Sequence, residues 1–248
     1  MKILSFAALI LVSFIFTSCK SSTETNGPLK TYSLVKPKVG SVFVYQQELL
    51  DSNGNVRTNA FQADSIWRVV AQDTSISGHS HVWLFRSSTS DSDLYYERTI
   101  GLSFLDNGDF DFAADFGVID QSMWLRMPLQ SGSEQHVVLD TMIAPDSSSS
   151  DTTSFRVHET VTTTNAGTSD YSLNGNTYQA VTFVVTLDGI ATSLQGQQLA
   201  DIHEVDNWTF IPALGFFAKH DMTETGHDLD GRRNADGERM ALVRYELK

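Results

Sequence analysis

The most constraining feature of this sequence is a succession of short segments rich in β-branched and aromatic residues, separated by turn residues. Segments such as 65–71 and 81–86 have the composition of β-strands. No long window repeats apolar residues at the three- and four-residue spacing of an amphipathic helix. Many short strands joined by polar turns predict an all-β fold, a single antiparallel β domain shaped as a curved half-barrel or a sandwich.

The turn signals support this interpretation. Asn53-Gly54 and Asn107-Gly108 each predict a hairpin, because an Asn-Gly pair accepts positive φ at both turn positions. We expect roughly nine to twelve strands, with short helical turns only at 112–117 or 194–200. A hydrophilic loop is expected at 226–237, before the last strand. Further strands are expected at 135–143, 154–164, 179–188, 203–210, 215–222 and 239–247.

The N-terminus has the form of an export signal. Lys2 is followed by an apolar run, Ile3–Phe16, which is too short for the roughly 20 residues of a membrane span. Phe16-Thr17-Ser18-Cys19 then resembles the lipobox of bacterial lipoproteins, and Cys19 is the only cysteine. We expect residues 1–18 to be a cleaved signal peptide, Cys19 to be acylated, 19–31 to be a flexible tether and 32–248 to be the β domain. The alternative is an ordinary secretory signal.

These expectations indicate where in the cell the protein lies and limit its possible partners. An acylated Cys19 would anchor the protein in the bacterial cell envelope, with the outer membrane as the expected site and the membrane face left open. The formal charge is −13, and removal of the signal peptide with Lys2 makes it one unit more negative. The chain is acidic and lacks the clusters of Lys and Arg that bind phosphate backbones. We therefore expect no nucleic acid partner.

No pattern of catalytic residues stands out. The chain has no Gly-x-Ser-x-Gly motif and no thiol besides Cys19. Asp109 and Asp111 are expected to point to water from an alternating hairpin. His79 and His81 share one face of an extended segment, but no third zinc ligand lies nearby in the sequence. We expect no catalytic residue, no metal site at these histidines, no cofactor and no enzymatic activity.

The 226–237 loop is rich in oxygen ligands but departs from the EF-hand pattern. Counted from Asp228, the sixth and twelfth positions are Arg233 and Arg239, where that motif needs Gly and Glu. A looser calcium site there and a solvated hairpin loop both remain open.

The tryptophans offer the sharpest binding hypothesis. They could pack in the core, or line a concave sheet that holds a ligand. The expected function is a non-catalytic binding module for a small apolar, glycan or peptide (protein) partner in the envelope. The alternative is a structural envelope lipoprotein with a filled core, and a hydrolase is third. The candidate ligand-lining residues are Trp67, Trp83, Trp124 and Trp208.

Three segments resemble uncharacterised β-rich lipoproteins of Bacteroidetes-like bacteria. They are an opening stretch from Tyr32 to Tyr45 with Pro37 and Gly40, the segment Trp208–Lys219, and the closing segment Arg239–Lys248. The resemblance implies a β-rich lipoprotein and carries no catalytic residues. It also suggests a curved half-barrel like that of periplasmic lipoprotein carriers.

Overall fold

The fold is a single antiparallel sheet. The computed structural model describes residues 33–51, 55–57, 63–89, 98–115, 124–129, 134–143 and 154–248, and these residues contain strands and no helix. The sheet has 12 strands in the order β6-β5-β4-β3-β2-β1-β12-β11-β10-β9-β8-β7. Strands that follow one another in the chain are therefore neighbours in the sheet, except β6 and β7, which lie at its two edges. The first and last strands, β1 and β12, pair with each other. The all-β prediction is confirmed.

The strands differ widely in length. They are β1 (Val42–Leu50), β2 (Ala63–Ile76), β3 (His79–Thr89), β4 (Thr99–Phe104), β5 (Phe110–Asp115), β6 (Leu125–Met127), β7 (Glu134–Ile143), β8 (Phe155–Leu173), β9 (Asn176–Ser193), β10 (Gln198–Ile211), β11 (Phe216–His227) and β12 (Arg233–Glu246).

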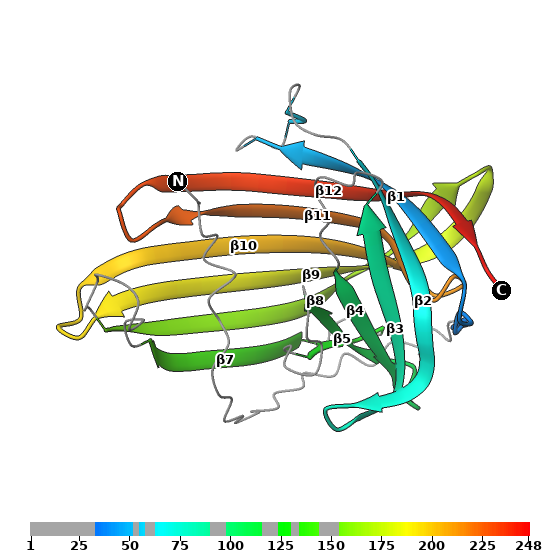
Figure 1. Cartoon of the computed structure of the whole chain (residues 1–248), viewed down its shortest axis with the longest axis horizontal. Coiled ribbons are helices and arrows are strands. Elements are labelled where there is room, and N and C mark those ends of the chain that lie inside the picture. The colour runs from blue at the N-terminus through cyan, green and yellow to red at the C-terminus, as the bar shows by residue number, and fades with distance from the viewer. Residues whose placement is uncertain are drawn as a thin grey trace.

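The sheet curls into a half-barrel that nearly closes. In Figure 1 the long strands β7–β12 lie side by side, and the strands from β1 to β5 cross over one end of them. Register shifts bend the strands, for example between Val44 and Tyr45 in β1. The two edges of the sheet approach each other where the Asn165 side chain of β8 donates to the Pro128 carbonyl after β6, at 2.8 Å.

Two Asn-Gly turns shape hairpins in different ways. Asn107-Gly108 joins β4 to β5, as predicted, but only Gly108 has positive φ (91°). Asn107 instead accepts the Asp109 backbone N–H through Oδ1 at 3.1 Å. At Asn174-Gly175, which the sequence analysis did not single out, φ is 52° and 78°, so both residues take the left-handed conformation of a type I′ turn.

Several local expectations are corrected. The described residues of the expected helical turn at 112–117 lie in β5, and residues 194–197 form the β9–β10 turn, so neither is helical. The expected loop at 226–237 is mostly strand: β11 runs to His227 and β12 starts at Arg233. The reason is that these polar residues pair with each other across the two strands, as Gly226 does with Asn234.

An N-terminal strap (Ser33–Gly40) closes one end of the half-barrel. The Val35 N–H donates to the Pro212 carbonyl at 2.8 Å, and the Trp83 indole Nε1 donates to the Pro37 carbonyl at 2.9 Å. Gly215, in the β10–β11 turn, lies against Val35 and Pro37. Two of the segments quoted for the lipoprotein resemblance therefore contact each other here.

Some expectations concern residues outside the described ranges. The signal peptide, Cys19, the tether and the Asn53-Gly54 turn lie outside the described residues. Over the part of the chain that is described, no helix is long and apolar enough to cross a membrane.

Candidate functional site

The inner face of the half-barrel is identified by the aromatic side chains that meet across it. Phe112 of β5 packs on Trp208 of β10, with ring centroids 5.0 Å apart, and Phe110 packs on Phe210 at 4.6 Å. These pairs join the two halves of the curved sheet, β1–β6 and β7–β12. Trp208 and Phe210 therefore point inward. Because side chains repeat every two residues along a strand, Asp206 and Glu204 lie on the same inner face.

Carboxylates continue this inner face beyond the aromatic core. Residues paired directly across an antiparallel sheet share a face, and Glu204 pairs with Glu224, which pairs with Asp236. One step nearer the core, Met222 lies between Asp206 and Glu238. We call these side chains, together with one from β8, the inner acidic patch: Glu159, Glu204, Asp206, Glu224, Asp236 and Glu238.

Two carboxyls of the patch, Glu204 and Asp206, form a hydrogen-bonded triad with His220. His220 Nε2 lies 2.6 Å from Asp206 Oδ1, and the His220 ring stacks on Trp208 with centroids 3.7 Å apart. Glu204 forms a side-chain hydrogen bond with Asp206. The His220 and Asp206 side chains are only 10% and 14% exposed. His220 Nδ1 is buried and has no hydrogen-bond partner among the residues that the structure describes.

Burial shifts the pKa of each member of the triad toward its neutral form. It raises the pKa of Glu204 to about 8, helped by the charge of Asp206, and raises the pKa of Asp206 to about 6. Burial lowers the pKa of His220 to about 4. At neutral pH His220 is therefore uncharged. Its Nε2–H donates to Asp206, which leaves Nδ1 as a buried acceptor.

Basic residues neutralise only part of the patch. Arg98 Nη1 lies 3.4 Å from Glu238 Oε1, and Arg57 pairs with Asp236. Among the described residues, no Lys, Arg or His forms an ion pair with Glu159, Glu204 or Glu224. Burial also raises the pKa of Glu159 and Glu224, and the charge of Glu204 adds to both shifts. The inner face therefore keeps an excess of acid.

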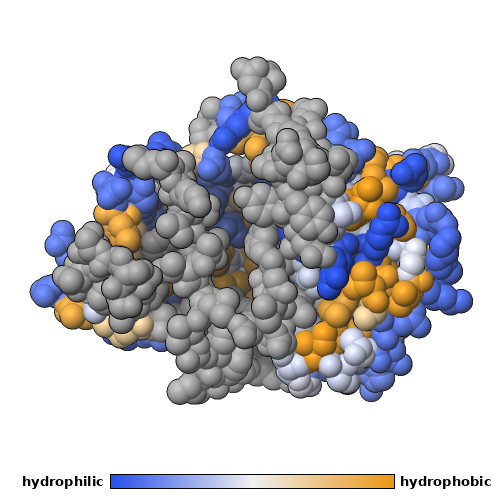
Figure 2. Space-filling model, viewed as in Figure 1, coloured by the Kyte–Doolittle hydropathy of each residue, from blue (hydrophilic) through white to orange (hydrophobic). Residues whose placement is uncertain are grey.

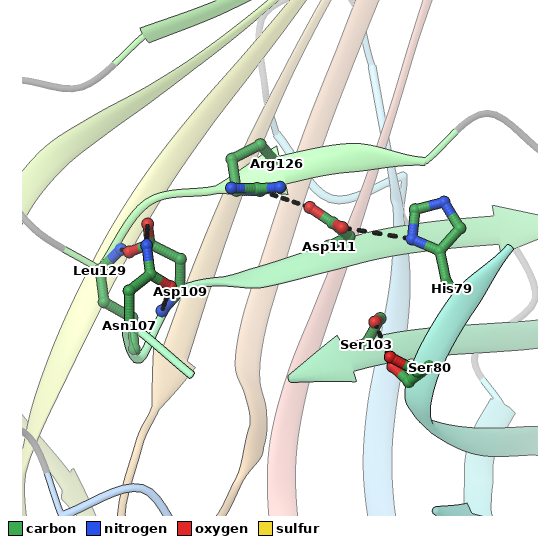
Figure 3. Close-up of polar contacts among 8 residues, drawn as sticks. All are labelled: His79, Ser80, Ser103, Asn107, Asp109, Asp111, Arg126 and Leu129. Atoms are coloured by element: carbon green, nitrogen blue, oxygen red, sulfur yellow. Dashed lines mark hydrogen bonds and ion pairs between the residues drawn. The ribbon is translucent and has the colours of Figure 1, made fainter. Parts of the chain in front are cut away.

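A second polar cluster lies on the outer face of β3–β6 (Figure 3). Asp111 accepts from His79 Nδ1 at 3.2 Å and from Arg126 Nε, and its side chain is only 10% exposed. His79 stacks on Trp124 with centroids 4.3 Å apart. The expectation that Asp111 points to water is thus wrong, because the side chains of His79 and Arg126 cover its carboxylate. The Asp109 carboxylate accepts the backbone N–H of Leu129, the second residue after β6, at 2.9 Å.

The four candidate tryptophans lie in different places. Trp67 and Trp208 line the same void, whose volume of about 10 Å³ is at the lower limit for one water molecule. Trp83 is buried against Phe104 and bonded to the strap. Trp124 lies on the outer cluster. Beside the void, Phe216 stacks on Phe85 with ring centroids 4.0 Å apart. Such aromatic packing fills the space between the two halves of the sheet at this end.

The side chains weighed as metal ligands from the sequence are not brought together. His79 and His81 bind different carboxylates, Asp111 and Asp73. Asp228 Oδ1 accepts the N–H groups of two residues of its own turn, so this oxygen serves the backbone. In the described ranges, no group of three or more His, Cys, Asp or Glu side chains has the arrangement to hold a metal ion.

Sequence reasoning missed the inner acidic patch, although a signal was present. In the run His203–Phe210, the residues at every second position are Glu204, Asp206, Trp208 and Phe210. Alternation therefore puts the two acids on the face of the two core aromatics, where a half-barrel turns inward.

Comparison with known proteins adds no relative. No family model, no curated protein and no solved structure matches the chain.

Proposed function

We propose that this protein is a lipid-anchored component of the bacterial cell envelope that binds a partner, without catalysis, on the concave face of its half-barrel. The N-terminal segment ending at Cys19 supports the anchor. The observation that carries the binding function is the inner acidic patch. Inner positions of a curved sheet are normally apolar, and buried carboxylates cost stability unless they are paired. Three of these six carboxylates have no basic partner among the described residues.

A structural role with a filled core is the second candidate, and the aromatic packing favours it. Phe43, Phe85 and Phe216 contact one another, and the void beside them is about water-sized. An apolar ligand of ordinary size would need a pocket of roughly 300 Å³ or more. The void at the aromatic end is far below that. We therefore favour a polar partner, a peptide or a glycan, over an apolar one.

The anchor is tested by the variant Cys19→Ala. We expect this protein to leave the membrane fraction, because no acyl chain would then hold it. Fractionation of host cells followed by immunoblotting measures the change, and Ser21→Ala is the matched control next to the anchor. If the Cys19→Ala protein stays in the membrane fraction like the control, the anchor proposal is wrong.

The binding role is tested by native mass spectrometry of the full-length protein purified from its host. We expect an additional mass that accompanies the wild-type protein and is reduced in the double variant Glu204→Gln/Glu224→Gln, because both side chains face inward. The control is Asp170→Asn/Asp188→Asn, which removes two exposed carboxylates from β8 and β9. A clean mass for the wild type and both variants would favour the structural role.

A further inference from the structure

We propose that the inner acidic patch is a site for an organic cation, the ammonium or guanidinium groups of a basic peptide. This inference rests on the binding function proposed above and names its ligand class. It follows from three features: a row of carboxyl groups across adjacent strands, a buried acceptor that has no partner in the described part of the chain, and a shortage of basic side chains.

The row of carboxyl groups is the first feature. Glu204 of β10, Glu224 of β11 and Asp236 of β12 are successive partners in the sheet. Side chains directly opposite each other in an antiparallel pair have Cβ atoms about 5 Å apart, and like charges at this distance would destabilise the sheet. The pKa of Glu204, about 8, keeps this carboxyl protonated at neutral pH. A cationic group placed over two neighbouring strands would contact two carboxyl groups at once and favour their ionised forms.

His220 supplies the second, independent feature. The residue is 8% exposed, and its Nδ1 atom is buried without a hydrogen-bond partner in the described part of the chain. Because Nε2 already donates to Asp206, Nδ1 is left to accept. A buried acceptor beside carboxylates, which are themselves acceptors, is complementary to a ligand rich in N–H donors. Arginine and lysine side chains carry such donors and no acceptor.

The shortage of basic side chains is the third feature and sets the class of ligand. Only Arg98 and Arg57 pair with the patch among the described residues, and His220 is uncharged at neutral pH. An anionic partner would be repelled. A bare metal ion fits poorly, because the carboxylates are spread over four strands and, within the described ranges, form no metal-binding group. A peptide with several cationic side chains matches a row of separated carboxylates.

The test is binding of fluorescein-labelled hexalysine to the full-length protein, followed by fluorescence anisotropy at an ionic strength of about 0.15 M, where charges beyond about 8 Å are screened. We expect Glu204→Gln/Glu224→Gln to weaken binding at least tenfold, since each lost carboxylate removes a charge-assisted hydrogen bond. The control Asp170→Asn/Asp188→Asn removes the same number of carboxyl groups from exposed positions and should change the affinity less than about threefold.

The outcomes separate the ligand class from the binding function. A loss confined to the inner double variant supports the cation site. Equal losses in both double variants would mean that hexalysine responds only to net charge, and this would overturn the proposal, as would no measurable binding. If hexalysine does not bind but the mass that accompanies the native protein still depends on Glu204 and Glu224, the cation class is wrong and the binding function stands.

Discussion

The variant Gly215→Ala should lose about 2–4 kcal/mol of unfolding free energy. Gly215 has φ of +65°, and a Cβ atom built there would lie 1.9 Å from the Val35 carbonyl oxygen and 2.7 Å from Pro37 Cδ. The alanine methyl group would therefore force the strap away from the β10–β11 turn. The Val35–Pro212 and Trp83–Pro37 hydrogen bonds depend on that contact. Urea unfolding followed by tryptophan fluorescence measures the loss.

Gly196→Ala is the matched control for this prediction. Gly196 also has a positive φ, +84°, but no atom lies within 4 Å of a Cβ built there. Its substitution should cost only the backbone conformation, about 1 kcal/mol. Equal losses at the two positions would show that the strap does not press on Gly215, and would contradict the described closure of this end of the half-barrel.

Stability should fall as pH rises from about 6.5 to 8, and Glu204→Gln should flatten this fall. A carboxyl whose folded pKa is raised binds a proton in the folded state that the unfolded state has lost, so stability declines between the unfolded and folded pKa values. For Glu204 the folded pKa is about 8. Asp206, at about 6, and His220, at about 4, act in opposite directions below pH 6.5, so Glu204 dominates above it.

The expected slope is at most about 1.4 kcal/mol per pH unit for one proton. Urea unfolding at several pH values gives the slope for the wild type and for Glu204→Gln. Glu246→Gln is the control, because that exposed carboxyl pairs with Lys248, which holds its pKa below the usual range. The assignment of the slope to Glu204 fails if Glu204→Gln declines as steeply as the wild type.

The fold class could be predicted because strand composition and alternation are local properties of the sequence. The pairing of β1 with β12 and the near closure at Asn165 depend on contacts between distant residues, which no local pattern encodes. The polar residues before the last strand suggested a loop, yet most of them form strand, because 226–227 pair with 233–234 across β11 and β12 and only 228–232 form the turn. Strand propensity alone cannot show such mutual pairing.

The candidate site was harder to predict than the fold. Aromatic residues drew attention because they are large, but Trp67 and Trp83 pack in the core and Trp124 lies outside. Asp111 is covered by His79 from β3, whose position depends on the sheet register. Glu204 and Asp206 were visible in the alternation. Their significance depends on which acids the neighbouring strands place beside them.

The shape of the molecule explains why the inner face, and not the outer one, is the candidate surface. Figure 2 shows the side on which the two halves meet, with hydrophilic residues along its margins and apolar residues gathered toward the end that β2 and β3 occupy. Exposed acids such as Asp188 have a nearby partner, in this case His203 Nδ1 at 2.6 Å. Isolated surface pairs of this kind contribute little and recognise little. The three carboxylates of the patch that lack a basic partner among the described residues, Glu159, Glu204 and Glu224, face inward.

The most direct test of the central claim is to locate bound hexalysine by NMR. The protein is labelled with ¹⁵N and ¹³C, and shifts of backbone amides and carboxyl carbons are followed during the titration. The inner-face site predicts that the largest changes occur at Glu204, Glu224 and Asp206, with the Trp208 indole N–H moving as well. Changes centred on outer carboxylates such as Asp170 and Asp188, with Glu204 and Glu224 unchanged, would contradict it.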